Sequence, residues 1–155
     1  MSANRAKTID ADESPIGQGC MDDELGFHLR RAQVAAFRHF AQTVTVAEGI
    51  TPGLYGMLQV IANTAALTQS ALAEAMDVDR SSIVKVVNQL VDKGLITRDP
   101  VPHDKRSYNL RMTAGGVQAL ARMEDAVKRQ DRAFSAGLSE AERAILINLL
   151  KRLYA

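Results

Sequence analysis

The stretch from Leu67 to Gly94 constrains the fold most, because it contains two short helix patterns separated by a break. Thr68 can cap the first helix, since its side-chain oxygen accepts a hydrogen bond from an unpaired backbone amide. Asp77-Val78-Asp79 then interrupts the helical pattern. The second helix begins at the N-cap Asp79 and ends before Gly94, a residue type that favours helix ends. We therefore predict two helices joined by a tight corner.

The second helix has an apolar face and a polar face. Apolar residues recur at three- and four-residue steps and predict burial of Ile83, Val86, Val87 and Leu90. In the first helix we expect the inward residues to be Leu72, Ala75 and Met76. The polar face of the second helix carries Ser81, Ser82, Lys85, Asn88 and Gln89. A helix of this width fits the major groove of B-DNA, so the pattern favours a helix-turn-helix, although these residues alone also fit an ordinary helical hairpin.

Two short extended runs follow the second helix. Leu95 to Asp99 is the first, and Ser107 to Met112 is the second, with polar and apolar residues in alternation. The intervening PVPHDKR contains two prolines, which forbid a helix, and it ends in basic residues. A hairpin with a charged tip directly after a recognition helix is typical of a wing.

These segments resemble the MarR family of bacterial winged-helix regulators. The resemblance is carried by LTQSALAEAM, by DRSSIVKVVNQLVDKGLITR and by DKRSYNLRMT, which fits the family's wing signature of Asp, any residue, Arg, a short strand and a closing Leu-x-Thr. It extends roughly from Asp22 to the C-terminus. Ala71 replaces a frequent Glu of a capping box, and Asp77 replaces a frequent Gly at the corner; Asp tolerates left-handed backbone, so we expect the corner to persist.

The predicted fold is mainly α with a small β-hairpin wing: a winged helix-turn-helix with N- and C-terminal dimerisation helices. Residues 1–20 are small, polar and without period, so we predict a flexible arm, followed by a single MarR-like domain over residues 21–155. Within it, residues 51–113 form the winged helix-turn-helix, and residues 21–48 and 114–155 form the dimerisation helices. Their apolar faces are too broad for one small domain to cover, and the resemblance implies a homodimer.

Helix starts and ends are marked by capping residues. A long helix is expected to begin at Asp22 and to end at Glu48-Gly49-Ile50. The next begins with Thr51 as N-cap and Pro52 at its first position, and places Leu54, Leu58 and Ile61 inward. Thr113 can cap a helix that turns Val117, Leu120, Met123, Val127 and Phe134 inward, and Ser139 to Glu142 forms a capping box before the last helix.

Charge is segregated along the chain, although the formal net charge is only +1. Residues 1–24 contain two basic and six acidic side chains, whereas residues 78–113 contain seven basic and four acidic ones. A basic recognition helix and wing are what contact with DNA phosphates requires. A dimer would double this basic surface.

We predict that the protein binds a roughly palindromic operator with two half-sites about one helical turn apart. On the recognition helix Ser81, Ser82, Lys85 and Asn88 face the major groove, together with Gln89, and Thr68 and Gln69 join them from the start of the first helix. From the wing, Arg106 enters the minor groove, positioned by Asp104. Arg98 or Lys105 contacts phosphate.

A second constellation lies on the first long helix, where His28, Arg31, Arg38, His39 and Gln42 place polar and cationic groups along a mostly apolar surface. The simpler explanation is that the arginines face solvent or pair with carboxylates such as Glu48. The resemblance implies a small-molecule site between the dimerisation helices and the winged domain, taking aromatic or phenolic acids or their thioesters. We assign it to His28, Arg31, Arg38 and Tyr55, near Gly53 and Gly56.

We therefore expect a repressor that its ligand releases from DNA, a kind of regulator suited to the control of aromatic compound catabolism. Its effector is a small aromatic or phenolic acid or an aromatic acyl-CoA thioester. Cys20 is the single cysteine, so it cannot form an internal disulfide. The alternative is a regulator that has no small-molecule effector and is controlled by the redox state of the Cys20 thiol. A helical interaction dimer without DNA binding is a further alternative, but it leaves the basic wing unexplained.

Other function classes find no support. His28 and His39 share a helix face but stand roughly 16 Å apart, so one metal ion cannot reach both. The chain has no Gly-rich phosphate loop, nucleophile elbow or paired carboxylates on an apolar face, so we expect no enzyme, no metal and no cofactor. It also has no apolar run long enough for a membrane span and no signal-peptide pattern, so we expect a cytoplasmic protein without a membrane partner.

Overall fold

The computed structural model describes residues 19–101 and 104–154, with the backbone alone for residues 19–20 and 104–106. The chain divides into two units, residues 1–34 and 35–155. The 3-10 helix η1 (Gly19–Asp23) precedes α1 (Leu25–Phe40), which begins in the first unit and ends in the second, so the predicted helix start at Asp22 is wrong. The amide of Glu24 donates to the carbonyl of Met21 (3.1 Å), which closes a tighter turn before the helix proper. Most of the predicted arm lies outside the described residues, and its flexibility stays a prediction.

The helix of α1 continues through a π-helical segment, η2 (Ala41–Thr45), and through α2 (Val46–Glu48). It ends at Gly49, which has φ 65°, so the predicted end is confirmed. The π-helical segment was not predicted. Within it the hydroxyl of Thr43 donates to the carbonyl of His39 (2.8 Å), and side-chain bonds of this kind compete with the regular backbone pattern of a helix.

The next helix, α3 (Pro52–Asn63), begins where the sequence predicts. The Thr51 side chain accepts from the amide of Leu54 (3.3 Å), and Pro52 occupies the first position. Leu54, Leu58 and Ile61 are buried as expected, and Met57 joins them. A Cβ on Gly56 would lie 3.3 Å from Cε of Met76, whereas one on Gly53 would meet open space, so of the two glycines only Gly56 lies in close contact with another element.

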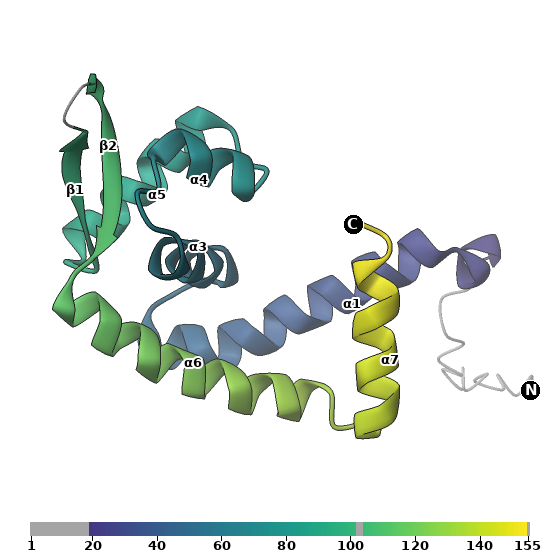
Figure 1. Cartoon of the computed structure of the whole chain (residues 1–155). Coiled ribbons are helices and arrows are strands. Elements are labelled where there is room, and N and C mark those ends of the chain that lie inside the picture. Colours follow the sequence, from purple (N-terminus) through teal and green to yellow (C-terminus); the bar gives the residue numbers. More distant parts are fainter. Residues whose placement is uncertain (1–18, 102–103, 155) are drawn as a thin grey trace, which may run out of the picture. The chain divides into compact units, whose positions relative to one another are not determined.

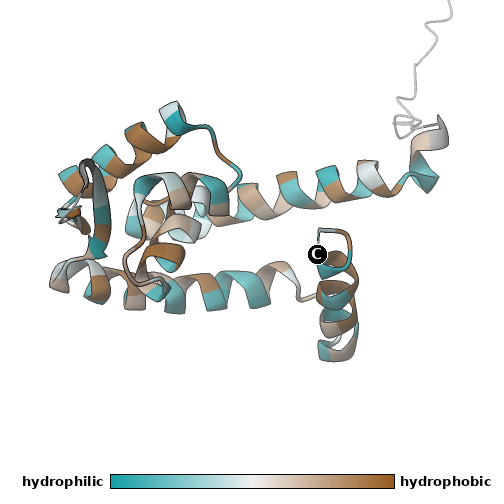
Figure 2. Ribbon diagram, turned by 45° about the horizontal axis from the view of Figure 1, so that its top comes forward, coloured by the Kyte–Doolittle hydropathy of each residue, from teal (hydrophilic) through white to brown (hydrophobic). Residues whose placement is uncertain are grey.

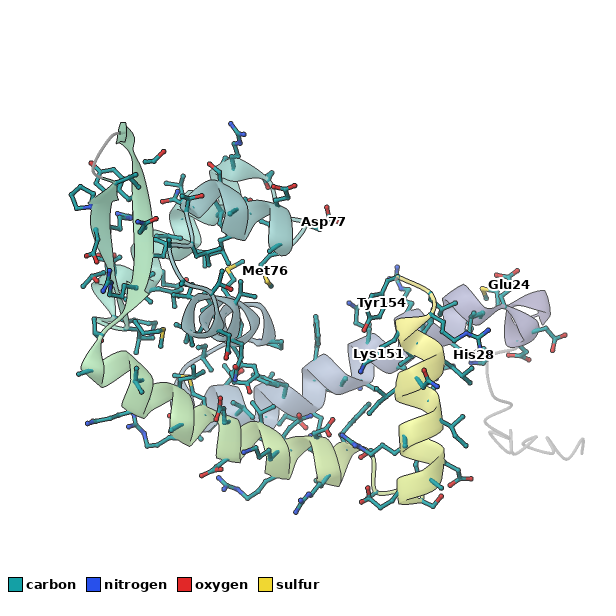
Figure 3. All side chains as sticks on the ribbon, viewed as in Figure 1. Glu24, His28, Met76, Asp77, Lys151 and Tyr154 are labelled. Carbon is teal, nitrogen blue, oxygen red and sulfur yellow. The ribbon has the colours of Figure 1, made fainter. Side chains whose placement is uncertain are left out.

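The helix-turn-helix consists of α4 (Gln69–Ala75) and α5 (Arg80–Asp92), capped by Thr68 and Asp79. Figure 3 labels Met76 and Asp77 at the corner between them, where Asp77 has φ 48°, the left-handed backbone that the sequence analysis expected Asp to tolerate. Gly94, with φ 68°, lies just past the end of α5 as predicted.

The predicted inward face of α4 is partly wrong. Leu72 is buried and Met76 packs against the core, but Ala73 is buried and Ala75 is exposed. Only one turn of the helix carries large apolar residues, so the spacing alone did not fix which small residue faces inward. On α5 the burial of Ile83, Val87 and Leu90 is confirmed, with Val86 partly buried against them.

The wing is an antiparallel hairpin of β1 (Ile96–Val101) and β2 (Asp104–Met112), paired from Ile96 with Met112 to Pro100 with Tyr108 (Figure 1). It is longer than predicted, and Pro100 lies within β1. This is possible because Pro, which lacks an N–H donor, is tolerated at the edge of a sheet. The other edge of β2 receives the segment before α4: the amide of Leu110 donates to the carbonyl of Leu67 (2.8 Å), a pairing that the sequence did not reveal.

After the wing come α6 (Ala114–Phe134) and α7 (Glu140–Lys151). Thr113 caps α6 by accepting from the amide of Gly116 (2.8 Å), and its hydroxyl donates to the carbonyl of Gly94 (2.7 Å). The predicted capping box of α7 is confirmed, and hydrogen bonds from Ser139 lower the pKa of the Glu142 carboxyl. Leu120 and Met123 are buried as expected and Val127 is partly buried, but Val117 and Phe134 are exposed.

The core of the second unit joins α3, the helix-turn-helix, the foot of the wing and α6. Its fully buried large side chains are Val44, Ile50, Leu58, Leu72, Ile83, Val87, Leu90 and Ile96. By contrast, α7 contains no buried residue, and its exposed large apolar side chains are Ile145, Leu146, Ile147 and Leu149. Figure 2 shows this hydrophobic colouring along the helix. Because such a surface is unfavourable in water, α7 is left with an apolar face that the described residues do not cover.

Candidate nucleic-acid interface and effector region

The recognition helix α5 turns its predicted polar face outward. Ser81, Lys85, Asn88 and Gln89 are exposed, and Ser82 is half-buried. Their orientation follows from the packing of α5, since the buried apolar residues hold its opposite side against the core. Arg80 and Val84 are exposed on the same helix and were not among the predicted contacts.

The cap of α5 uses one of the side chains predicted to reach DNA. The hydroxyl of Ser81 donates to Oδ1 of Asp79 (2.6 Å), and the amide of Ser82 donates to the same oxygen (2.9 Å). Hydrogen bonds from Ser81 and then from Ser82 stabilise the carboxylate and hold the pKa of Asp79 well below its ordinary value. The Ser81 hydroxyl thus has its proton engaged and presents lone pairs, which accept hydrogen bonds.

Asn88 and Arg98 meet across α5 and β1, although the sequence analysis gave them separate roles. Nη2 of Arg98 donates to Oδ1 of Asn88, and Arg98 is half-buried. A guanidinium group can only donate, so this bond fixes the amide of Asn88 with its oxygen toward Arg98. The amide nitrogen of Asn88 is then the group turned away from Arg98. Contact of Arg98 with phosphate stays a prediction.

The remaining predicted contacts lie at the start of α4 and in the wing. Thr68 uses its side-chain oxygen to cap α4 (3.2 Å to the amide of Ala71). Gln69 lines a hollow of about 150 Å³ with Ser70, Arg80, Ile83 and Val84. Lys105 and Arg106 belong to β2, but the side chains of residues 104–106, Asp104 included, lie outside the description, so the DNA contacts of the wing stay predictions.

Two of the four predicted effector residues lie in the first unit. His28 is exposed, with Nε2 2.6 Å from the carbonyl oxygen of Asp22. The guanidinium carbon of Arg31 lies 5.7 Å from the ring centroid of Phe27, a cation–π contact. The simpler explanation offered Glu48 as a partner for an arginine of the first helix. Oε2 of Glu48 instead lies 3.9 Å from Nε of Arg122.

The other two effector residues, Arg38 and Tyr55, lie in the second unit. Arg38 is exposed, and Tyr55 is half-buried. Nε2 of Gln59 donates to the hydroxyl of Tyr55 (2.9 Å) and to Oε1 of Glu124 (2.9 Å), which ties α3 to α6. Gln59 and Glu124 were not predicted, because they lie 65 residues apart and carry no local motif. The effector site itself stays a prediction.

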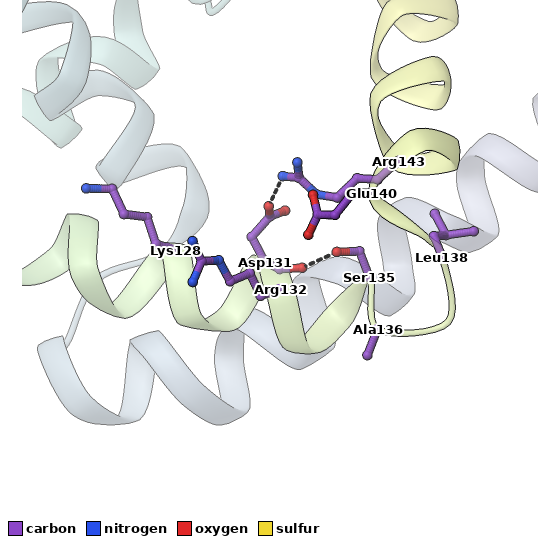
Figure 4. A pocket seen from close by; sticks show the side chains of 8 residues that line it. All are labelled: Lys128, Asp131, Arg132, Ser135, Ala136, Leu138, Glu140 and Arg143. Carbon is purple, nitrogen blue, oxygen red and sulfur yellow. Dashed lines mark hydrogen bonds and ion pairs between the residues drawn. The ribbon is translucent and has the colours of Figure 1, made fainter.

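A hollow of about 380 Å³ lies where α6 turns into α7 (Figure 4). Asp131 of α6 pairs with Arg143 of α7, and the hydroxyl of Ser135 donates to the carbonyl of Asp131 (2.7 Å). Lys128, Arg132 and Glu140 complete the charged part of the lining. None of the predicted site residues lines this hollow. Its walls are mostly polar, which suits the pairing of the two helices better than the binding of an aromatic ring.

Within residues 19–101 and 104–154, no three His, Cys, Asp or Glu side chains are placed to hold a metal ion. The helices of the described part are also too short or too polar to span a bilayer.

Comparison with known proteins gives consistent matches. The model of the MarR family matches residues 48–107. The chain is 66% identical over 154 residues to a protein of Thauera aromatica whose name assigns it to transcriptional regulation of the hcr operon, covering 99% of this chain and 93% of that one.

Two solved structures are similar over most of the chain. The repressor CouR bound to a 23-mer DNA duplex has a TM-score of 0.86 and 26% identity, covering 92% of this chain and 100% of CouR. The regulator PcaV of Streptomyces coelicolor in complex with its natural ligand has a TM-score of 0.76 and 28% identity, covering 86% of this chain and 93% of PcaV.

Proposed function

From the premise that this chain belongs to the MarR family, we propose that it is a homodimeric repressor that a small aromatic ligand releases from its operator. The family consists of transcriptional regulators that bind DNA, and it is not a class of enzymes. The proposal adds the oligomeric state, the sign of regulation and the effector.

The observation that carries the proposal is the outward polar face of α5 beside the basic wing. A recognition helix pinned by Ile83, Val87 and Leu90 presents Lys85, Asn88 and Gln89 on a rigid element, as base contacts require. Arg106 in the minor groove and Lys105 or Arg98 on phosphate would supply affinity that depends on salt. The similarity to CouR, solved as a repressor on a DNA duplex, supports repression.

The apolar face of α7 supports the homodimer. Ile145, Leu146 and Leu149 are each close to half exposed in the single chain. A second copy would cover them, and two-fold symmetry would then place two α5 helices on the half-sites of a palindromic operator, about one helical turn apart. Such a regulator acts in the cytoplasm.

The effector we propose is an aromatic or phenolic acid or its CoA thioester, held by His28, Arg31, Arg38 and Tyr55. Guanidinium groups suit carboxylate and phosphate anions, and the Phe27 ring under Arg31 adds an aromatic surface beside the cation. The similarity to PcaV, solved with its natural ligand, supports control by a small molecule. Control of aromatic compound catabolism is the matching role.

The effector is tested by thermal-shift screening of hydroxybenzoates, hydroxycinnamates and their CoA thioesters, followed by operator binding with the compounds that stabilise the protein. A useful effector must prefer the free dimer at least tenfold, about 1.4 kcal/mol. Arg31→Ala should abolish the stabilisation, and Arg30→Ala, which removes an exposed arginine from the same helix, should keep it.

No stabilisation by any compound, or equal stabilisation in the wild type and Arg31→Ala, would refute the effector site. Loss of regulation in Cys20→Ser alone would instead favour control through the thiol, the alternative without a small-molecule effector. Each of these outcomes leaves the operator binding itself unaffected.

A further inference from the structure

We infer that Val84 on α5 contacts the C5-methyl group of a thymine in each operator half-site and so determines part of the sequence preference. This inference rests on the proposed operator binding through α5. It adds a residue outside the predicted set of DNA contacts, and it names the chemical group that this residue recognises.

Val84 is the one apolar member of the exposed surface of α5. Its side chain is 43% exposed. The other exposed residues of this helix are Arg80, Ser81, Lys85, Asn88, Gln89 and Asp92, all polar or charged. Val84 lies one turn after Arg80 and one turn before Asn88, which is the middle of this surface. A single exposed valine is ordinary elsewhere on a protein. At the centre of a base-reading surface, however, it is the side chain that approaches the base edges.

The surroundings of Val84 suit a small apolar group. Val84 and Ile83 supply apolar lining to the hollow of about 150 Å³ between α4 and α5, and Gln69, Ser70 and Arg80 supply its polar groups. The major-groove edges of the four bases present donors, acceptors and one apolar group, the methyl of thymine. A valine offers no hydrogen bond, so among these groups thymine methyl is the one that it can favour.

The neighbours of Val84 strengthen this assignment. Arg80 carries donors one turn earlier, and the amide of Asn88, held by Arg98, presents its nitrogen one turn later. Donors on both sides favour base edges rich in acceptors, and thymine offers its O4 acceptor beside the methyl group. Arg80, Val84 and Asn88 together form one short surface along α5 that can contact neighbouring base edges.

The test replaces thymine by deoxyuridine, which keeps every hydrogen-bonding group and lacks only the methyl. A duplex of about 25 base pairs, long enough for two half-sites one turn apart, is first selected from a random library with the wild-type protein. Each thymine pair related by the palindrome is then replaced by deoxyuridine, and the dissociation constants of wild type and Val84→Ala are measured.

In the wild type we expect one thymine position at which the replacement weakens binding about fourfold for each half-site, the value of one buried CH₂ group. In Val84→Ala the same replacement should have no effect. Val117→Ala, at another exposed valine outside the helix-turn-helix, should behave as the wild type does, and thermal melting confirms that each variant is folded.

Two results would overturn the inference: no thymine position sensitive to deoxyuridine in the wild type, or a sensitivity that Val84→Ala retains in full. Failure of the proposed function is a different result, because then the wild type would select no duplex at all, even at low salt. In that case Val84 would have no operator to contact, and the inference would be refuted together with the proposed function.

Discussion

At the scale of single residues, hydrogen bonds made within the protein determine what the recognition helix can offer to DNA. The hydroxyl of Ser81 donates to Asp79, and the amide oxygen of Asn88 accepts from Arg98. Ser81 is therefore available as an acceptor and Asn88 as a donor. A donor selects acceptor atoms such as guanine N7 and O6, whereas a free Asn amide can pair with both groups of adenine.

The role of Arg98 can be tested by freeing Asn88. In Arg98→Met the Asn88 amide can rotate, so the base that it addresses should shift toward adenine, by about 1–3 kcal/mol in relative preference. Arg98→Lys keeps a donor and should retain more of the original preference. Selection of duplexes from a random library with each protein measures this, and identical base preferences in the wild type and Arg98→Met would contradict it.

Gly116 tests how closely α6 packs on the foot of the wing. A Cβ at this position would lie 1.9 Å from the carbonyl oxygen of Leu95, so the backbone must move in Gly116→Ala. We expect a loss of about 1–3 kcal/mol in the free energy of unfolding. Gly115→Ala is the matched control, since its Cβ would lie 3.8 Å from Oγ1 of Thr113, and it should be neutral or stabilising. Denaturant unfolding measures the stability of the two variants. Equal free energies of unfolding for Gly116→Ala and Gly115→Ala would contradict the packing described.

At the scale of elements, the sequence was informative wherever a residue acts on its own neighbours. Thr51, Thr68, Asp79, Thr113 and Ser139 all cap the helices that they were predicted to begin. Caps and glycine ends are predictable because their donors and acceptors lie within four residues of one another. The wing was predictable for a similar reason, from alternation bounded by prolines.

Features that depend on distant contacts could not be predicted in this way. The pairing of Leu67 with β2, the bond from Gln59 to Glu124 and the hollow between α6 and α7 each join residues far apart in the sequence or depend on how helices meet. The inward face of α4 and the places of Val117 and Phe134 were wrong, because periodicity predicts that a helix has an apolar side but not which part of that side the neighbouring elements cover.

The cap of α5 should make stability depend on pH. Because the pKa of Asp79 is lower in the folded chain than in the unfolded chain, the cap contributes fully above the ordinary Asp range, and its contribution is lost as pH falls through and below that range. Asp79→Asn should therefore reduce the decline of the melting temperature between pH 6 and pH 3, a window of about three units that spans this range.

Asp77→Asn is the control for this titration, since it removes a carboxylate from the corner next to the cap. Because Asp77 does not cap α5, the Asp77→Asn protein retains the cap, and its melting temperature should still fall with acid. A wild-type decline that is unchanged in Asp79→Asn would show that the cap carries no pH dependence.

At the scale of the whole molecule, the apolar face of α7 and the proposed DNA-reading helix α5 are related through the symmetry of a dimer. Operator palindromy follows from two-fold symmetry, so the sequence preference of one α5 is used twice only if the chains pair. The amount of apolar side chain left exposed on α7 is the physical reason to expect that pairing.

The dimer is tested by placing a charge on this face. Leu149→Glu buries a carboxylate in the proposed interface without a partner, and we expect the dissociation constant of the dimer to rise at least tenfold. Asn148→Glu adds the same charge at the neighbouring exposed position and should leave the dimer intact. Light scattering over a concentration series gives the masses, and a Leu149→Glu protein as dimeric as the wild type would contradict the assignment of α7.

The central claim, that α5 reads sequence while the wing supplies affinity, is tested most directly by one set of binding measurements. Dissociation constants are measured over a series of salt concentrations for a selected palindromic duplex and for a scrambled one, with wild type, Lys85→Ala and Arg106→Ala. We predict that Lys85→Ala lowers the preference for the selected duplex by about 1–3 kcal/mol, whereas Arg106→Ala weakens both duplexes alike and reduces the salt slope by about one. A preference that Lys85→Ala leaves unchanged, together with wild-type affinity in Arg106→Ala, would contradict the account.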